Sequence, residues 1–199
     1  GPLTKIGIKK YFKSNIQIPT IIRYKYFYLN SFLSKKYTYK EVELKEKLPQ
    51  IIHFIDTSLK KYDFYIKRDT EYLEWKYLFN PNLKFYTLEI YNHGKIEAIL
   101  IFSSIHKRKL LVTQTKAVTL LDIFISENSN FTFKDALLTI GRFYKRKKQD
   151  FDGIFTLQNC KYKPSFCYPL KGSILLSTIK GKSITPYISY SDQDMEQMI

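Results

Sequence analysis

The sequence lacks any apolar run long enough to span a membrane. Its longest such stretches, residues 98–102 and 118–121, are far shorter than the ~20 residues of a membrane-spanning helix. No secretory signal is visible, and the start, Gly1-Pro2-Leu3, resembles a protease-cleavage scar. We therefore expect a cytoplasmic protein with no transmembrane segment, whose natural form extends further towards the N-terminus.

Metal-binding side chains are scarce as well. The chain has two cysteines, Cys160 and Cys167, and three histidines that lie far from them in sequence. Their spacing matches no common zinc motif, and so few cysteines suit a reducing compartment. We predict no metal site.

Acidic residues are few beside the basic ones, 18 against 33, which gives a net charge of +15. Such an excess favours an anionic partner: a nucleic acid, a membrane surface or an acidic protein. Arginine, which suits the reading of guanine edges, occurs only at positions 23, 68, 108, 142 and 146. Lys, Ile, Asn, Tyr and Phe all have A/T-rich codons, so a skewed genome is a sufficient cause of the charge. A nucleic-acid-binding protein therefore stays an alternative and not the leading hypothesis.

Enough apolar residues are present for a globular core. At 199 residues and 44% hydrophobic content, one domain is expected. We assign residues 1–40 to a basic N-terminal arm or partial strand and 41–199 to the domain. A short strand is predicted at 41–45, followed by a helix that Pro49 opens and whose apolar stripe is Ile51, Ile52, Ile55 and Leu59.

A second, short helix is predicted within residues 67–81. Asp69 and Thr70 are typical of a helix start, and Asn80-Pro81 ends the helix. Its aromatic and aliphatic side chains recur at helical spacing, which predicts a buried face made of Tyr72, Trp75, Leu78 and Phe79. We expect Trp75 to anchor the helix against the sheet.

Strand patterns follow this helix. Alternation at 85–91 and 96–103, joined by Asn92-His93-Gly94, predicts a hairpin. Residues 107–109 are predicted to form a turn, and 110–126 to be one long strand or two strands broken near Thr115. Further closing strands are predicted at 173–179 and 187–190.

One segment predicts a parallel crossover. An apolar strand at 118–125 leads through a polar loop, 127–131, into a helix at 132–149 and a further strand at 154–157. Thr132 and Asp135 have the spacing of a capping box. A strand–helix–strand unit of this length pairs its strands in parallel. The expected fold class is thus α+β, with a mixed, mostly antiparallel sheet, one parallel βαβ crossover and flanking helices.

These patterns resemble the GNAT (GCN5-related) acyltransferase superfamily over residues 45–194. They resemble more narrowly a bacterial branch associated with surface-polysaccharide or acyl-amino-acid biosynthesis. The matching residues are Arg68, Asp69, Tyr72, Leu73, Trp75, Lys76, Tyr77, Asn80, Pro81, Tyr86 and Gly94. Leu121-Asp122 and the tail at 191–194 resemble further marks of that branch, and Lys76 stands where the branch has arginine.

The resemblance implies an N-acyltransferase with a GNAT-like sheet. Such a protein moves an acyl group from the thioester of acetyl-CoA, another acyl-CoA or an acidic carrier protein to a small amine. The residues that this resemblance implies for binding the thioester are Phe124, Ile125, Ser126, Asn128, Ser129, Asn130, Phe131 and Asn159. Asp122 would be either a catalytic base or a partnered structural carboxylate, and Tyr168, or alternatively Tyr162, the acid that protonates the thiolate.

The segment that should bind the donor's pyrophosphate departs from the family pattern. Residues 126–133 contain no glycine, and Glu127 brings a negative charge to the helix entry. Three alternatives follow: an altered CoA site, a carrier protein as donor, or a domain without catalysis that serves binding or assembly. The basic residues at 142–148 are read as a solvated helix face, with docking of an acidic carrier protein as the alternative.

Overall fold

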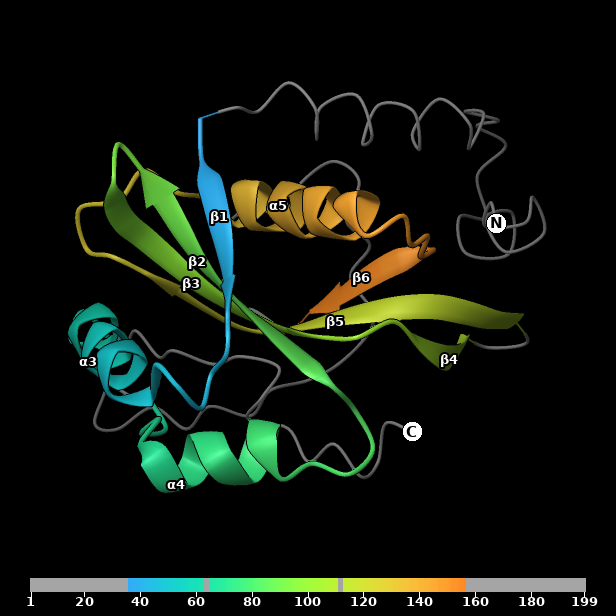
Figure 1. The fold of residues 1–199 in the computed structure, drawn as a ribbon, viewed down its shortest axis with the longest axis horizontal. Helices are drawn as coiled ribbons and strands as arrows, with labels where there is room; N and C mark the ends of the chain where they lie inside the picture. Colours follow the sequence, from blue (N-terminus) through green and yellow to red (C-terminus); the bar gives the residue numbers. More distant parts are fainter. Residues whose placement is uncertain (1–35, 63–64, 111–112, 157–199) are drawn as a thin grey trace, which may run out of the picture.

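The computed structural model describes residues 36–62, 65–110 and 113–156 (Figure 1). The division at residue 40 stays a prediction, because most of the arm lies outside the described residues. Also outside them are Asn159, Tyr168, the tail at 191–194 and the predicted closing strands at 173–179 and 187–190.

Within the described ranges six strands form one sheet, in the order β1-β2-β3-β5-β4 with β6 also paired to β5. The strands are β1 (Thr38–Val42), β2 (Phe85–Asn92), β3 (Lys95–Ser103), β4 (His106–Leu110), β5 (Thr113–Ile125) and β6 (Gly153–Thr156). β3 pairs with the C-terminal part of β5 and β4 with its N-terminal part, both antiparallel. β6 pairs with β5 in parallel, from Ala117 opposite Gly153 to Leu120 opposite Thr156. The predicted mixed sheet with one parallel crossover is confirmed.

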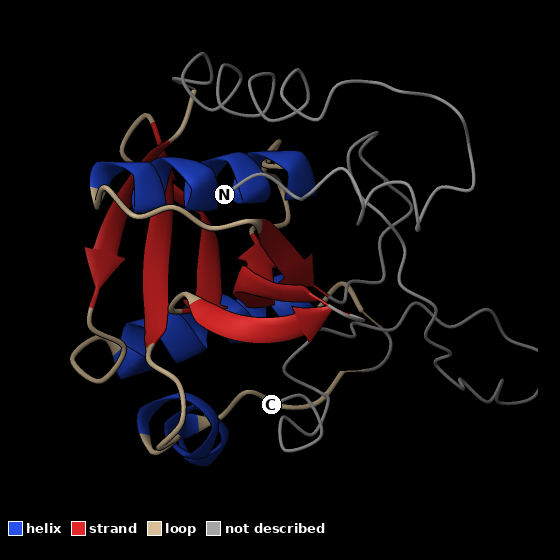
Figure 2. Cartoon of the chain, turned by 90° about the vertical axis from the view of Figure 1, so that its right-hand side faces the viewer, coloured by secondary structure: helices blue, strands red, loops and turns tan. Residues whose placement is uncertain are grey.

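Helices cover both faces of the sheet (Figure 2). α5 (Phe133–Arg146) packs on one face, where its inward side joins a cluster with Leu100, Phe102, Val118 and Leu120. α3 (Leu48–Leu59), α4 (Thr70–Leu73) and the π-helical turn η1 (Glu74–Leu78) lie on the other face. Their cluster contains Ile99, Ile101, Leu121 and Phe124.

The locally encoded features form as predicted. Thr132 Oγ1 accepts a hydrogen bond from the Asp135 N–H (3.2 Å), and the Asp135 carboxylate accepts one from the Thr132 N–H (2.9 Å). This reciprocal pair is the capping box at the start of α5. The β2–β3 hairpin turns at His93 and Gly94, which have positive φ angles of 48° and 79°. Pro49 lies in the first turn of α3, and Ile51, Ile55 and Leu59 are buried.

Two strand predictions need correction. Residues 107–109 belong to β4 and do not form a turn, because each pairs with a residue of β5 between Gln114 and Lys116. β1 runs from Thr38 to Val42 and not over 41–45, since Thr38 already pairs with Tyr91. β1 and β4 lie at the ends of the strand order and contain charged residues, so a hydrophobicity pattern does not reveal them as strands.

The expected burial of Trp75 is wrong. Trp75 is 61% exposed and Phe79 70% exposed, whereas Leu73, Lys76 and Tyr77 face inward. The Phe79 N–H donates to the carbonyl of Glu74, five residues earlier, as in a π-helix. A π-turn holds more residues than an α-turn, so side chains after Leu73 no longer follow the α-helical spacing used for the prediction. Trp75 contacts the Tyr72 ring, and the Lys76 ammonium lies 5.0 Å from the Trp75 ring centroid.

Candidate functional site

A β-bulge interrupts the pairing of β5 with β3. Leu120 lies opposite Phe102 and Asp122 opposite Ile101, so Leu121 is an extra residue. Strict alternation from Leu120, which faces α5, would also turn Asp122 towards α5. Because the bulge adds one residue to the alternation, Asp122 instead points to the face of the sheet that α3 and α4 cover. The register shift therefore determines which side chains contact the Asp122 carboxylate.

Asp122 is held by two residues of the 67–81 segment. Its Oδ1 lies 3.4 Å from Nη2 of Arg68, and its Oδ2 accepts a hydrogen bond from the Tyr77 hydroxyl. The side chains of both Arg68 and Asp122 are 0% exposed. The Arg68 guanidinium also donates to the Ile66 carbonyl (2.6 Å) and lies over the Tyr72 ring. We call Arg68, Tyr77 and Asp122 the buried triad.

The buried triad bears on both sequence interpretations of Asp122. Each carboxylate oxygen already has a donor, and full burial separates the group from solvent. These contacts favour the partnered structural carboxylate over the base. The sequence pattern included Arg68 and Tyr77 but gave them no role. An aspartate inside an apolar strand needs a buried partner for its charge. This requirement could have indicated an arginine as the partner of Asp122 from the sequence.

Main-chain groups at the end of β5 face two different directions. The Ser126 N–H donates to the Glu97 carbonyl (3.0 Å), so Ser126 faces β3. Along each strand of an antiparallel pair, residues whose N–H and C=O face the partner strand alternate with residues whose N–H and C=O point away from it. Ile123 and Ile125 therefore direct their main-chain groups away from β3, to the side where β6 pairs earlier in the strand. Within the described residues β6 extends to Thr156, opposite Leu120, and we call the outward main chain of Ile125 the open edge.

Lys61 reaches the open edge from the end of α3. Its Nζ donates to the Ile125 carbonyl at 3.1 Å. Desolvation of this amino group lowers the pKa of Lys61 below the usual lysine value, and the Glu127 carboxylate opposes the shift. Sequence reasoning missed Lys61, because no local pattern reveals a contact across 64 residues.

The predicted thioester-binding residues form the end of β5 and the loop that follows, and their side chains differ in burial. Phe124 is buried beneath α3, and Phe131 is buried against Tyr37, with ring centroids 5.0 Å apart. Asn128 and Asn130 are exposed. The Ser129 N–H bonds to the Ser126 carbonyl and the Phe131 N–H to Ser129 Oγ, so hydrogen bonds shape the loop without glycine.

Carboxylates lie at the start of α5. Asp135 stands in the first turn, where the capping box holds it, and Glu127 is exposed in the preceding loop. A helix N-terminus attracts anions through its N–H groups and dipole. Here the capping box already occupies two of those donors, and a pyrophosphate would meet two negative charges. The geometry therefore fits a pyrophosphate poorly.

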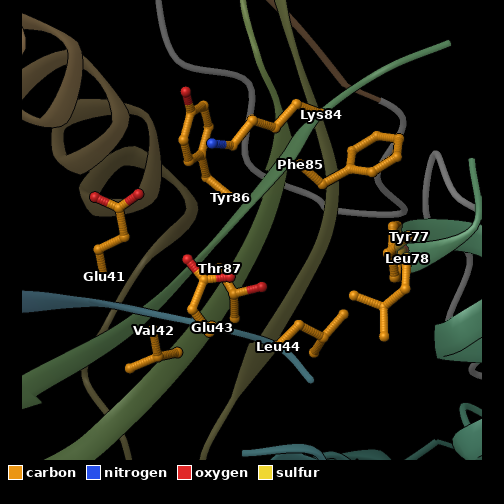
Figure 3. A pocket seen from close by; sticks show the side chains of 10 residues that line it. All are labelled: Glu41, Val42, Glu43, Leu44, Tyr77, Leu78, Lys84, Phe85, Tyr86 and Thr87. Carbon is orange, nitrogen blue, oxygen red and sulfur yellow. The ribbon is translucent and has the colours of Figure 1, made fainter. Parts of the chain in front are cut away.

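The structure has a small pocket among the side chains that Figure 3 labels. It has a volume of about 50 Å³, lies between β1, the start of β2 and η1, and is lined by Glu41, Glu43, Tyr77, Lys84 and Phe85 among others. That volume suits a few water molecules. None of its lining residues belongs to β5, the loop or α5, so it does not form part of the thioester site.

Within residues 36–62, 65–110 and 113–156, no group of three His, Cys, Asp or Glu side chains could bind a metal ion. A search of the same ranges for a helix with the length and apolar character of a membrane span found none.

Comparison with known proteins returned similar structures only. No protein-family model and no curated protein matches the chain. An aminoglycoside acetyltransferase from an uncultured soil metagenomic sample, solved with trehalose and with sisomicin, is 19% identical with a TM-score of 0.45, over 74% of this chain and 99% of that one.

Two further structures have lower scores. A ribosomal-protein-alanine N-acetyltransferase from Brucella melitensis is 13% identical, with a TM-score of 0.42 over 73% of this chain and 99% of that one. A GNAT family acetyltransferase from Staphylococcus aureus is also 13% identical, with a TM-score of 0.42 over 72% and 99%. With every TM-score below 0.5, the fold assignment rests on the strand order and crossover described above.

Proposed function

We propose that the chain is a GNAT-type N-acyltransferase domain, which moves an acyl group from a thioester to a small amine. The observation that carries the proposal is the parallel β5–α5–β6 crossover next to the bulge of β5 at Leu121. The outward main chain of Ile125, the open edge, lies after that bulge and before the loop that leads into α5. The narrower bacterial branch is proposed from the 68–81 pattern, whose Arg68 and Tyr77 both bind Asp122.

The donor would bind as an added strand. Pantetheine contains two amide groups, and the outward main chain of Ile125 can pair with one of them as a neighbouring strand would. Binding in this way would place the thioester near the bulge at Leu121. The carboxylates of Glu127 and Asp135 disfavour the adenosine pyrophosphate of CoA. We therefore propose a donor with less charge at this point, such as the phosphopantetheine arm of an acidic carrier protein.

A second candidate is a GNAT-like domain without catalysis, which serves binding or assembly. The contact between Lys61 Nζ and the Ile125 carbonyl favours it, because the ammonium occupies a hydrogen-bond acceptor that the donor needs.

Thermal unfolding with a series of donors separates the candidates. We expect S-acyl-pantetheine and acylated carrier protein to raise Tm at least as much as acetyl-CoA does, since binding to the folded state alone stabilises it. Thiol release in the presence of amines should accompany this shift. A folded chain that no thioester stabilises, and that releases no thiol, would leave the noncatalytic candidate.

Replacing Lys61 by methionine tests the open edge itself. The substitution removes the competing ammonium while keeping the side-chain stem. Because a hydrogen bond contributes about 0.5–1.5 kcal/mol net, donor binding should tighten roughly 2- to 10-fold. Titration calorimetry with S-acetyl-pantetheine measures it, and Lys60→Met, at the exposed neighbouring position, is the matched control. Weaker binding by Lys61→Met alone would show that Lys61 contacts the donor and does not block it.

A further inference from the structure

We propose that the C-terminal part of α5 is the docking surface for the acidic carrier protein that the proposed function names as acyl donor. The inference rests on that function and adds where the protein part of the donor binds. The surface consists of Arg142 and Arg146 on α5, Lys147 and Lys148 just after it, and the Tyr39 ring on β1. We call these five residues the basic surface.

Both arginines of the basic surface are held against β1. The guanidinium carbon of Arg146 lies 5.0 Å from the centroid of the Tyr39 ring, and that of Arg142 lies 6.0 Å from it. Arg142 also donates from Nη1 to the Tyr37 carbonyl and from Nη2 to Thr139 Oγ1, each at 3.1 Å. A solvated helix face, the first interpretation of residues 142–148, would leave such side chains free to rotate. Because these contacts fix them, binding a partner costs less side-chain entropy.

The positive charge of the basic surface is only partly neutralised. Lys147 Nζ lies 3.1 Å from a carboxylate oxygen of Glu41 and 4.7 Å from the centroid of the Tyr86 ring. No carboxylate of the described residues forms an ion pair with Arg146 or Lys148, and both side chains are exposed. The remaining positive charge attracts an acidic protein and repels a basic one.

The two arginines lie close enough to affect each other. Burial lowers the pKa of Arg142, Tyr39 opposes this shift, and the positive charge of Arg146 adds to it. A carboxylate of a partner that binds Arg146 beside Arg142 relieves this repulsion, and arginine can bind it through two parallel hydrogen bonds. The helix dipole favours cations in the last turn of α5, but it does not account for Arg142 one turn earlier. The arrangement therefore favours docking over a solvated face.

α5 connects the basic surface to the thioester site. The helix begins at Phe133, after the loop that follows Ile125, and its 14 residues span about 20 Å. A phosphopantetheine arm has about as many chain atoms as a peptide of five residues, and together with the serine that carries it the arm spans roughly 20 Å when extended. A carrier on the basic surface can therefore lay its arm along α5 and bring the thioester to the open edge.

Reversal of two charges tests the basic surface. The probe is the acetylated acyl carrier protein of fatty-acid synthesis, which is acidic. We expect Arg146→Glu/Lys148→Glu to raise KM for this donor at least 10-fold, because two like charges would face its carboxylates. KM for S-acetyl-pantetheine should stay unchanged, since this donor has no protein part. Lys107→Glu/Lys116→Glu is the matched control, with the same change of charge at exposed, paired positions of β4 and β5.

A second readout needs no acyl transfer. The unmodified carrier, which has no arm, should still bind the wild-type chain in titration calorimetry at low salt, and its binding should weaken as salt is added. Arg146→Glu/Lys148→Glu should lose this binding, and the control should keep it. If the reversal lowers Tm, Arg146→Gln/Lys148→Gln removes the same charges without adding new ones, and it should weaken binding in the same direction.

The outcomes separate the docking surface from the proposed function. An unchanged KM for the carrier in a folded Arg146→Glu/Lys148→Glu would overturn the surface alone, and so would a chain that accepts S-acetyl-pantetheine but binds no carrier. Mixed-sequence DNA that binds as tightly as the carrier, and that the same variant releases, would assign the basic surface to nucleic acid. A wild-type chain that no thioester stabilises and that releases no thiol would overturn the proposed function and this inference with it.

Discussion

Replacing Asp122 by alanine is expected to lower the free energy of unfolding by about 3–5 kcal/mol. The change removes the carboxylate that balances the Arg68 guanidinium, and both side chains are fully buried. It also removes the acceptor of the Tyr77 hydroxyl. A charge left in an apolar interior without its counter-ion is the physical source of the loss. Urea denaturation measures it.

The double variant Arg68→Met/Asp122→Leu is the control for this result. Because it removes both charges and keeps apolar volume, much of the stability lost in the single variant should return. Acyl transfer should then also survive, since Asp122 is assigned a structural role. Additive losses in the double variant would mean that the two side chains do not act as a pair, and a folded but inactive double variant would restore Asp122 as the base.

Phe143→Ala should be destabilising to a similar degree, by about 3–5 kcal/mol. Phe143 is 2% exposed and packs at ring-centroid distances of 5.0 Å from Tyr86, 5.2 Å from Phe102 and 5.1 Å from Tyr144. Its loss would open a cavity between α5 and the sheet. The shift in the urea midpoint reports the change.

Trp75→Ala is the matched control for Phe143→Ala. Although tryptophan is the larger side chain, its exposure on η1 limits the expected change to about 0.5 kcal/mol. A larger loss from Trp75→Ala than from Phe143→Ala would reinstate the predicted anchor and contradict the π-helical register.

Local signals account for the part of the fold that the sequence predicts. Thr132 and Asp135 satisfy each other within one turn, and His93-Gly94 supplies the positive φ angles of a tight hairpin turn. The alternation of apolar residues then indicates which strands lie inside the sheet. These features depend on residues close in sequence, so they can be read without the tertiary structure.

Long-range contacts account for the rest. The π-turn at 74–78 moves Trp75 outward because Lys76 and Tyr77 face the sheet, where Tyr77 meets Asp122. The bulge at Leu121 depends on the register with β3, which no single strand encodes. Lys61 meets Ile125 only because α3 ends beside β5. Each of these decides the chemistry of the site, and none has a local sequence pattern.

The open edge at Ile125 is the feature on which the proposed donor binding depends. Amide hydrogen exchange of the ¹⁵N-labelled chain, measured by NMR with and without S-acetyl-pantetheine, tests it directly. The Ile125 amide should exchange quickly in the free chain and become protected by the donor, while Ile99, which pairs with Phe124 inside the sheet, stays protected throughout. If the Ile125 amide is already protected without donor, or remains unchanged when the donor binds, β5 does not hold the thioester through its main chain.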